Sequence, residues 1–391
     1  MAIEGRSDAK GSGKIRLGMV GGGQGAFIGA VHRLAARMDD HYEFVAGALS
    51  SDAARSKASG EELGLATDRT YTDFREMAKA EAKRKDGIEV VSIVTPNHMH
   101  FPAAKAFIEA GIHVVCDKPL SLNLKEAKTL EKLLVRKKGV IFALTHNYSG
   151  YPMIRQAKAM VAAGELGDIR LVQGEYPQDW LTTALEKTGQ KQAAWRTDPK
   201  RSGAGGCVGD IGTHTYQLMC DVSGLSGTEL AADLTSFVKG RKLDDNAHVM
   251  LRFNKGAKGM LWASQVAPGH ENGLKIRVYG TKGGLEWTQA DPNYLWYTPY
   301  GEVKRLITRG GAGSNAAAAR VTRVPPGHPE GYLEGFANIY TEVARAIKAK
   351  RAGKKVDKDV TFPGIADGVA GMAFIEACVK SSAKNGKWTK L

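Results

Sequence analysis

The 391-residue chain has little cysteine: its four residues form neither a CxxC pair nor the spacing of a zinc site. It also lacks an apolar run long enough to span a membrane, and its first residues lack the apolar core of a signal peptide. These absences argue against a disulfide scaffold, a metal centre and a membrane protein. We therefore expect reduced, buried thiols, no bound metal and a cytoplasmic location.

Acidic residues are fewer than basic ones, 41 against 55, which gives a net charge of +14 and a pI near 9.5. The lysines and arginines are spread along the chain, and no nucleic-acid recognition motif or aromatic–basic platform accompanies them. We interpret the charge as a solubility property, and we expect no nucleic-acid partner.

The length predicts two domains. Up to residue 145, short apolar strands alternate with helical patterns, which is typical of a parallel sheet built from βαβ units. After residue 146 the alternation is of the antiparallel type. We predict an α/β protein: a flexible tail (1–13), a Rossmann dinucleotide-binding domain (14–145), and an α+β domain with a large open mixed sheet (146–391).

A glycine-rich turn follows the first strand (15–20) and precedes a helix (27–38). Glycines allow the backbone to approach a pyrophosphate closely, and the helix N-terminus beyond them favours an anion. This context, and not the glycines alone, indicates dinucleotide binding. The cofactor-binding candidates in the turn are Gly21, Gly23, Gln24, Gly25, Ala26 and Phe27.

The second strand lacks the acid that binds the ribose hydroxyls of NAD, because Leu49 stands where it is expected. Ser50, Ser51 and Arg55 follow as cofactor-binding candidates, and Arg55 is able to contact a 2′-phosphate. Asp52 either reaches the ribose or caps its helix. We favour NAD and leave NADP open.

Two further strands are followed by polar motifs at the same predicted end of the sheet, the carboxyl ends of its strands. The first motif supplies Thr95, Pro96, Asn97 and His100, which contact the cofactor or cap the next helix. The second is Asp117-Lys118-Pro119, which places an amine where open α/β sheets bind ligands. Asp117 and Lys118 are therefore also cofactor-binding candidates.

The second domain contains the segment Asp210-Ile211-Gly212-Thr213-His214, which opens a helix. Side chains at i and i+4 share one helical face, and a histidine next to an acid is suited to proton transfer. A capped helix with a packed histidine is the structural alternative. Trp195 and Arg196 lie in the long preceding insertion, where indole faces stack on pyranose rings and charged groups bind hydroxyls or an anion.

These motifs, in this order, resemble the glucose–fructose oxidoreductase / inositol dehydrogenase / MocA family over nearly the whole chain. The matching segments are VGGGQGAFIGAVHR, VSIVTPNHMH, GIHVVCDKPLSLNLKEA, GDIGTHTYQL and GMAFIEACVKSSAKNGKW. The resemblance implies that Lys118 bonds the reacting hydroxyl and that His214, paired with Asp210, is the general acid/base. It also implies that His328 contacts substrate and that the sheet of the second domain forms a homodimer or homotetramer.

We therefore expect an NAD(P)-dependent oxidation of a secondary hydroxyl of a sugar, glycoside or cyclitol. Two alternatives stay open: a redox-neutral glycosidase or lyase that works through a transient keto-glycoside, and a non-enzymatic nucleotide sensor.

Overall fold

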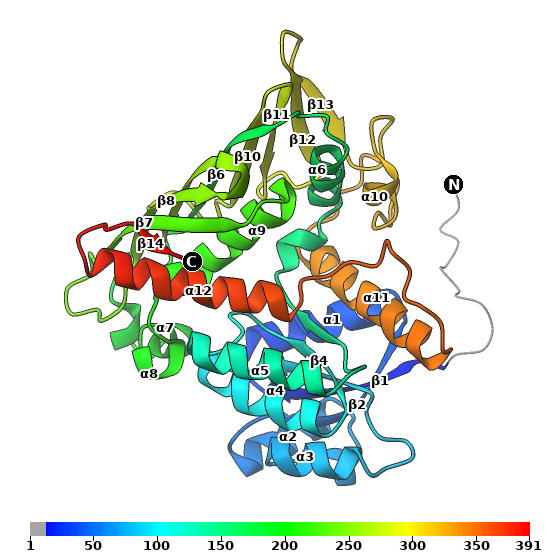
Figure 1. Ribbon diagram of the computed structural model, residues 1–391. Helices are drawn as coiled ribbons and strands as arrows, with labels where there is room; N and C mark the ends of the chain where they lie inside the picture. The colour runs from blue at the N-terminus through cyan, green and yellow to red at the C-terminus, as the bar shows by residue number, and fades with distance from the viewer. Residues whose placement is uncertain (1–12) are drawn as a thin grey trace. The chain divides into compact units, whose positions relative to one another are not determined.

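The computed structural model describes residues 13–391, which form two compact units (Figure 1). The predicted flexible tail lies outside the described residues except for its last residue. The first unit comprises residues 13–121, 125–150 and 332–369, and the second comprises 122–124, 151–331 and 370–391. Each unit is built around its own sheet.

The sheet of the first unit is parallel, with the strand order β2-β1-β3-β4-β5. Its strands are β1 (Ile15–Gly21), β2 (Tyr42–Ala48), β3 (Val90–Val94), β4 (His113–Cys116) and β5 (Phe142–Leu144). β3 and β4 are buried at every position, as expected for parallel strands that are covered on both faces. The predicted Rossmann topology is confirmed.

Helices of the first unit follow the strands along the chain. They are α1 (Phe27–Met38), α2 (Ala53–Glu62), α3 (Phe74–Glu81), α4 (His100–Glu109) and α5 (Leu124–Arg136), with a late helix, α11 (Tyr332–Arg351). Of these helices, α3 was not predicted from the sequence.

The helix α11 belongs to the first unit, although the sequence analysis placed all of 146–391 in the second domain. The reason is its apolar face: Phe336, Tyr340 and Val343 pack in one core with Leu17 of β1 and Val31 of α1. The chain therefore returns to the first unit after building most of the second.

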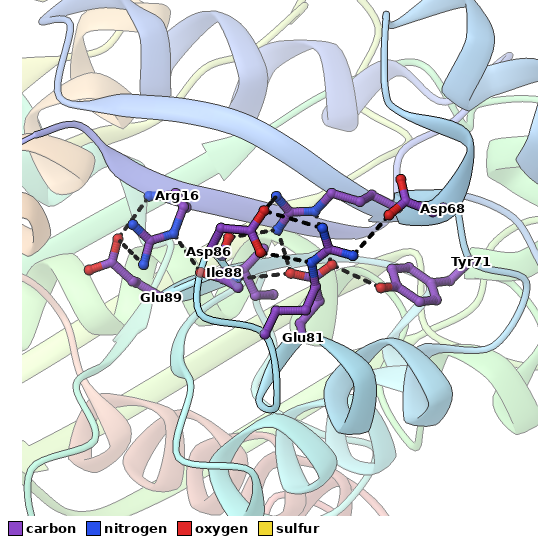
Figure 2. A network of polar contacts seen from close by, with 10 residues as sticks. Arg16, Asp68, Tyr71, Glu81, Asp86, Ile88 and Glu89 are labelled. Carbon is purple, nitrogen blue, oxygen red and sulfur yellow. Dashed lines mark hydrogen bonds and ion pairs between the residues drawn. The ribbon is translucent and has the colours of Figure 1, made fainter.

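An ion-pair network lies at the amino-terminal ends of β1 and β3 (Figure 2). The buried carboxylate of Glu81 accepts hydrogen bonds from Arg69 (2.5 Å), Tyr71 (2.9 Å) and the amide of Ile88 (3.0 Å). Burial and the bond to Glu81 raise the pKa of Tyr71 to about 12. This network attaches α3 to the amino-terminal ends of the strands, whereas the glycine turn lies at the carboxyl end of β1.

The second unit contains a nine-stranded mixed sheet with the order β13-β12-β11-β10-β6-β9-β8-β7-β14. Among the strands described in residues 13–391, β6 and β9 alone of this sheet pair in parallel. The strands are β6 (Ile169–Pro177), β7 (Gly227–Thr235), β8 (Asn246–Phe253), β9 (Lys258–Ser264), β10 (Lys275–Gly280), β11 (Gly283–Thr288), β12 (Tyr294–Pro299), β13 (Arg305–Thr308) and β14 (Thr389–Lys390). The predicted large mixed sheet is confirmed.

Helix α9 (Thr213–Ser223) packs on β6, where Gly174 makes room for Thr215 and Met219. The other helices are α6 (Pro152–Ala162), α7 (Lys191–Arg196), α8 (Pro199–Ser202), α10 (Ala316–Ala319) and α12 (Ile365–Ser382), the last shared with the first unit. No helix within residues 13–391 combines the length and apolar character that crossing a bilayer requires.

Candidate active site

The glycine turn joins β1 to α1 in a conformation that only glycine adopts easily. Gly21, Gly22 and Gly25 have φ angles of 81°, 75° and 74°. A Cβ atom on Gly29, in the first turn of α1, would lie 2.3 Å from the Cα of Gly22, so helix and turn touch backbone to backbone. Arg33, which the sequence analysis did not single out, donates to the carbonyl of Gly22 at 2.8 Å.

The end of β2 closes against this turn. The amide of Gly23 donates to the carbonyl of Leu49 at 3.2 Å, and the Leu49 side chain is buried. Asp52 accepts from the amide of Arg55 at 2.7 Å, so of its two predicted roles the structure shows the helix cap. Arg55 is exposed in the first turn of α2.

Thr95 directly follows β3, at the carboxyl end of the parallel sheet. Its Oγ1 is buried and has no hydrogen-bond partner among residues 13–391. A Cβ atom on Gly21 would lie 3.0 Å from the Cγ2 of Thr95, so this side chain stands directly against the glycine turn. A close-approach cradle with a buried hydroxyl beside it fits a dinucleotide.

His100 lies deeper than a cofactor contact would require. Its ring is 1% exposed; Nδ1 lies 2.6 Å from the carbonyl oxygen of Pro119, and Nε2 lies 2.8 Å from that of Thr95. His100 thus links the ends of β3 and β4, and its predicted contact with the cofactor stays a prediction, as do those of Pro96 and the buried Asn97.

The Asp117-Lys118-Pro119 segment follows β4 as predicted, and its Lys118–Pro119 peptide is cis. Asp117 Oδ1 accepts from the hydroxyl of Thr145 at 2.7 Å and from the amide of Lys118 at 3.1 Å. The half-buried Lys118 is therefore held through its backbone. Behind it, His146 is buried; burial and the charge of Lys118 lower its pKa to about 3, so the ring is neutral.

In the second unit, the helix that carries Asp210 and His214 opens with a π-helical turn, Val208–Gly212, before α9. Such turns are frequent at functional sites. Asp210 Oδ2 accepts from Gln265 Nε2 at 2.9 Å and lies 3.3 Å from Arg196 Nε. The structure therefore brings the predicted Arg196 to the predicted Asp210 and adds Gln265, for which no sequence motif gave a signal.

Two indole rings lie beside the Arg196 side of this ion pair. The Arg196 guanidinium lies 4.2 Å from the ring centre of Trp195 and 5.9 Å from that of Trp180. Trp180 donates to Gln178, and Gln178 and Tyr176 both donate to Asn272. His214 is 7% exposed, and its ring centre lies 6.4 Å from that of Tyr176.

His328 is placed differently. His328 is exposed, and its backbone carbonyl accepts a hydrogen bond from Arg309. Arg309 in turn forms an ion pair with the buried Glu330 at 2.9 Å. No hydrogen bond or ring contact described within residues 13–391 connects the His328 side chain with Asp210 or Arg196, so its substrate contact stays a prediction.

Comparison with known families matches both units. Residues 15–146 match the model described as "Oxidoreductase family, NAD-binding Rossmann fold", and residues 154–286 match the "GFO/IDH/MocA C-terminal domain". The first unit is thus an NAD-binding Rossmann domain. Among described residues 13–391, no group of three or more His, Cys, Asp or Glu side chains is arranged to hold a metal ion.

Three relatives cover nearly the whole chain. An oxidoreductase structure from Sinorhizobium meliloti is 62% identical and covers 97% of this chain and 100% of its own, with a TM-score of 0.88. An inositol dehydrogenase homolog from Azotobacter vinelandii, complexed with NADH and myo-inositol, is 36% identical over 97% and 98%, with a TM-score of 0.90. The uncharacterized oxidoreductase YfiI of Bacillus subtilis is 38% identical over 96% of each chain.

Proposed function

The chain belongs to the GFO/IDH/MocA family of NAD-binding oxidoreductases, and from this premise we propose that it oxidises a secondary hydroxyl of a neutral sugar, glycoside or cyclitol to the keto compound. The Azotobacter relative, complexed with NADH and myo-inositol, supports the cyclitol class.

The ion pair between Arg196 and Asp210 is the main observation in favour of a neutral substrate over an anionic one. An insertion rich in lysine and arginine is equally compatible, as sequence, with a carboxylate or sulfonate substrate. In the structure, however, the charge of Arg196 is balanced by a carboxylate 3.3 Å away, and its guanidinium stacks on Trp195. A charge-balanced site with indole faces favours an uncharged ring with many hydroxyls over an anion.

The residues divide the chemistry between them. Lys118 binds the reacting hydroxyl, and His214 removes its proton, with Asp210 beside it in the ion pair. The nicotinamide ring, when bound, supplies the hydride acceptor. The dinucleotide would be held by Gly21, Gly23, Gln24, Gly25, Ala26, Phe27, Ser50, Ser51, Arg55, Thr95, Pro96, Asn97, His100, Asp117 and Lys118. NAD is favoured, and NADP is accepted if Arg55 binds the 2′-phosphate.

The outward face of the nine-stranded sheet supports a homodimer or homotetramer. Met250 and Met260 are paired across β8 and β9 and are each 55% exposed, and Leu171 and Trp296 are exposed on β6 and β12. Exposed apolar side chains gathered on one sheet in this way are a candidate association surface. Light scattering coupled to size exclusion tests the oligomer. The cytoplasmic location stays a prediction.

The proposal is tested by following reduced-nicotinamide absorbance with NAD and NADP against sugars, glycosides and inositols, with sugar acids and sulfonates alongside. We expect turnover with neutral polyols. Turnover only with the acids would overturn the substrate class. Cleavage of a glycoside without net cofactor reduction, with solvent deuterium entering the sugar, would instead show the redox-neutral reaction.

A further inference from the structure

Residues 241–245, which we call the 241–245 turn, form the second half of the connection between β7 and β8. They attach to three segments that carry candidate substrate-side residues. These segments are the π-helical turn with Asp210, the stretch after β9 with Gln265, and the insertion with Trp180. The turn is buried at its key positions: Arg241 is 9% exposed, Asp244 9% and Asp245 0%.

Asp244 caps the helix that carries Asp210 and His214. Its Oδ1 accepts from the amide of Gly206 at 2.6 Å, and its Oδ2 accepts from the amide of Val208 at 2.8 Å. Its backbone carbonyl accepts from the amide of Cys207 at 2.8 Å. Three consecutive amides, which a helix start leaves without intrahelical partners, are thus satisfied by one residue.

Close packing fixes this arrangement. A Cβ atom on Gly206 would lie 2.1 Å from the carbonyl oxygen of Asp244, so only glycine allows the two backbones to meet. Burial raises the pKa of Asp244, opposed by the bonds from Val208 and Gly206. The cap therefore fixes where the helix begins and how it is rotated about its axis.

Asp245 holds Gln265, which is the second side chain in contact with Asp210. Its carbonyl accepts from the amide of Gln265 at 2.8 Å, and the Gln265 side chain donates to Asp210. The Asp245 carboxylate accepts from the amides of Phe237 and Val238 and from Arg241 at 3.0 Å. The donor to Asp210 and the helix that bears Asp210 are therefore anchored at adjacent residues.

Arg241 attaches the insertion. Its guanidinium donates to the carbonyls of Leu181 (3.0 Å) and Thr183 (3.1 Å) and to the carboxylate of Glu186 (3.0 Å). Leu181 directly follows Trp180, whose ring faces Arg196. All three segments that meet at the Arg196–Asp210 pair are thus tied to the 241–245 turn.

We propose that Asp244 is the positioning residue of the acid–base helix: it acts through Asp210 and His214 and sets their placement by capping the helix start. It need not touch substrate or cofactor. The kinetic part of this inference rests on the proposed function, and its structural part does not.

The kinetic test compares Asp244→Asn, which keeps one acceptor oxygen, with Asp244→Ala, which keeps none. At a temperature where both variants are folded, we expect kcat to fall in that order, by up to roughly a hundredfold for the alanine variant. The pH profile of kcat/KM should move, because His214 and Asp210 are displaced, while the affinity for NAD stays as in the wild type.

Asp73→Ala is the matched control. Asp73 also caps a helix with one carboxylate, accepting from the amides of Arg75 (2.6 Å) and Glu76 (3.1 Å), but it belongs to α3 of the first unit. It should lower the melting temperature without changing kcat or the pH profile. Equal kinetic effects in Asp73→Ala and Asp244→Ala would overturn the positioning role.

Hydrogen exchange separates this inference from the proposed function. In Asp244→Ala, the amides of Gly206 and Val208 should exchange about tenfold faster, as expected for a lost hydrogen bond, and the effect should extend through 210–214 while the first unit is unchanged. Exchange confined to 206–208, or a global increase, refutes the positioning role even if no substrate is found. A dead substrate panel with this local exchange pattern refutes the proposed function alone.

Discussion

The guanidinium of Arg196 lies 3.3 Å from the carboxylate of Asp210, with Arg196 on α7 and Asp210 in the π-helical turn before α9. Both side chains are mostly buried, at 26% and 17% exposure. Partial burial weakens solvent screening, so this pair has more weight than an exposed one. In the proposed function, this pair balances one positive charge on the substrate side of the site.

Replacing Arg196 by glutamine should lower kcat/KM for a neutral polyol by about ten- to a hundredfold. Removing one partner of a buried polar group costs about 1–3 kcal/mol, and the variant leaves the mostly buried Asp210 without its cationic partner. Steady-state kinetics measure the effect. Lys191→Gln, at an exposed position of the same helix, is the control and should be unchanged; a gain of activity on anionic sugars in Arg196→Gln would contradict the assignment.

Lys118→Ala should reduce turnover by roughly 10²–10⁴-fold, the range expected when a proton-handling group is lost. The affinity for NAD should change little, because Asp117 accepts from the backbone amide at 118, which the substitution keeps. Turnover and nucleotide titration are measured on the same preparation. Lys105→Ala, which removes an exposed pair with Glu109, provides the comparison, and undiminished turnover of Lys118→Ala would refute its role.

Gly29→Ala should weaken NAD binding and lower stability. The new methyl group would lie 2.3 Å from the Cα of Gly22, so the glycine turn or α1 must move, at a cost of about 1–3 kcal/mol for overpacking. Calorimetric titration with NAD and thermal melting report the two effects. Gly364→Ala is the control, since its Cβ would meet nothing closer than 3.7 Å. Wild-type affinity in Gly29→Ala would mean that the turn does not form the cradle.

Acidification from pH 6.5 to 4 should lower the free energy of unfolding, in part through His32. This ring is fully buried against Ser92 and Tyr340, and burial lowers its pKa from 6.5 to about 4. In that window the unfolded chain binds a proton that the folded chain does not, so stability rises with pH by up to about 3 kcal/mol.

Urea unfolding at several pH values measures this slope. His32→Asn should flatten it, although His113 and His146, whose pKa values burial lowers to about 4 and about 3, retain a share. The exposed His248, replaced by asparagine, should leave the slope as it is. An unchanged slope in His32→Asn would show that its ring is not the neutral buried group described.

Local patterns predicted much of the fold. The helix 27–38 has the predicted bounds, because its apolar spacing lies within the segment itself. The strand before Lys118 and the glycine turn were predicted for the same reason. The insertion before Asp210 was predicted only as a long loop, whereas it contains the short helices α7 and α8. Helices this short depend on tertiary contacts more than on their own sequence.

By itself, then, the sequence determined that a glycine turn, a lysine at a strand end and a helix start with Asp and His occur in this order. Each of these motifs depends on only a few consecutive residues. Only the tertiary structure decided that Arg196 neutralises Asp210, that Gln265 donates to it, that Asp244 caps its helix, and that α11 returns to the first unit. These contacts join residues from 14 to more than 300 positions apart. They follow from which buried polar groups and apolar faces find partners when the whole chain is packed, and periodicity within one segment does not specify them.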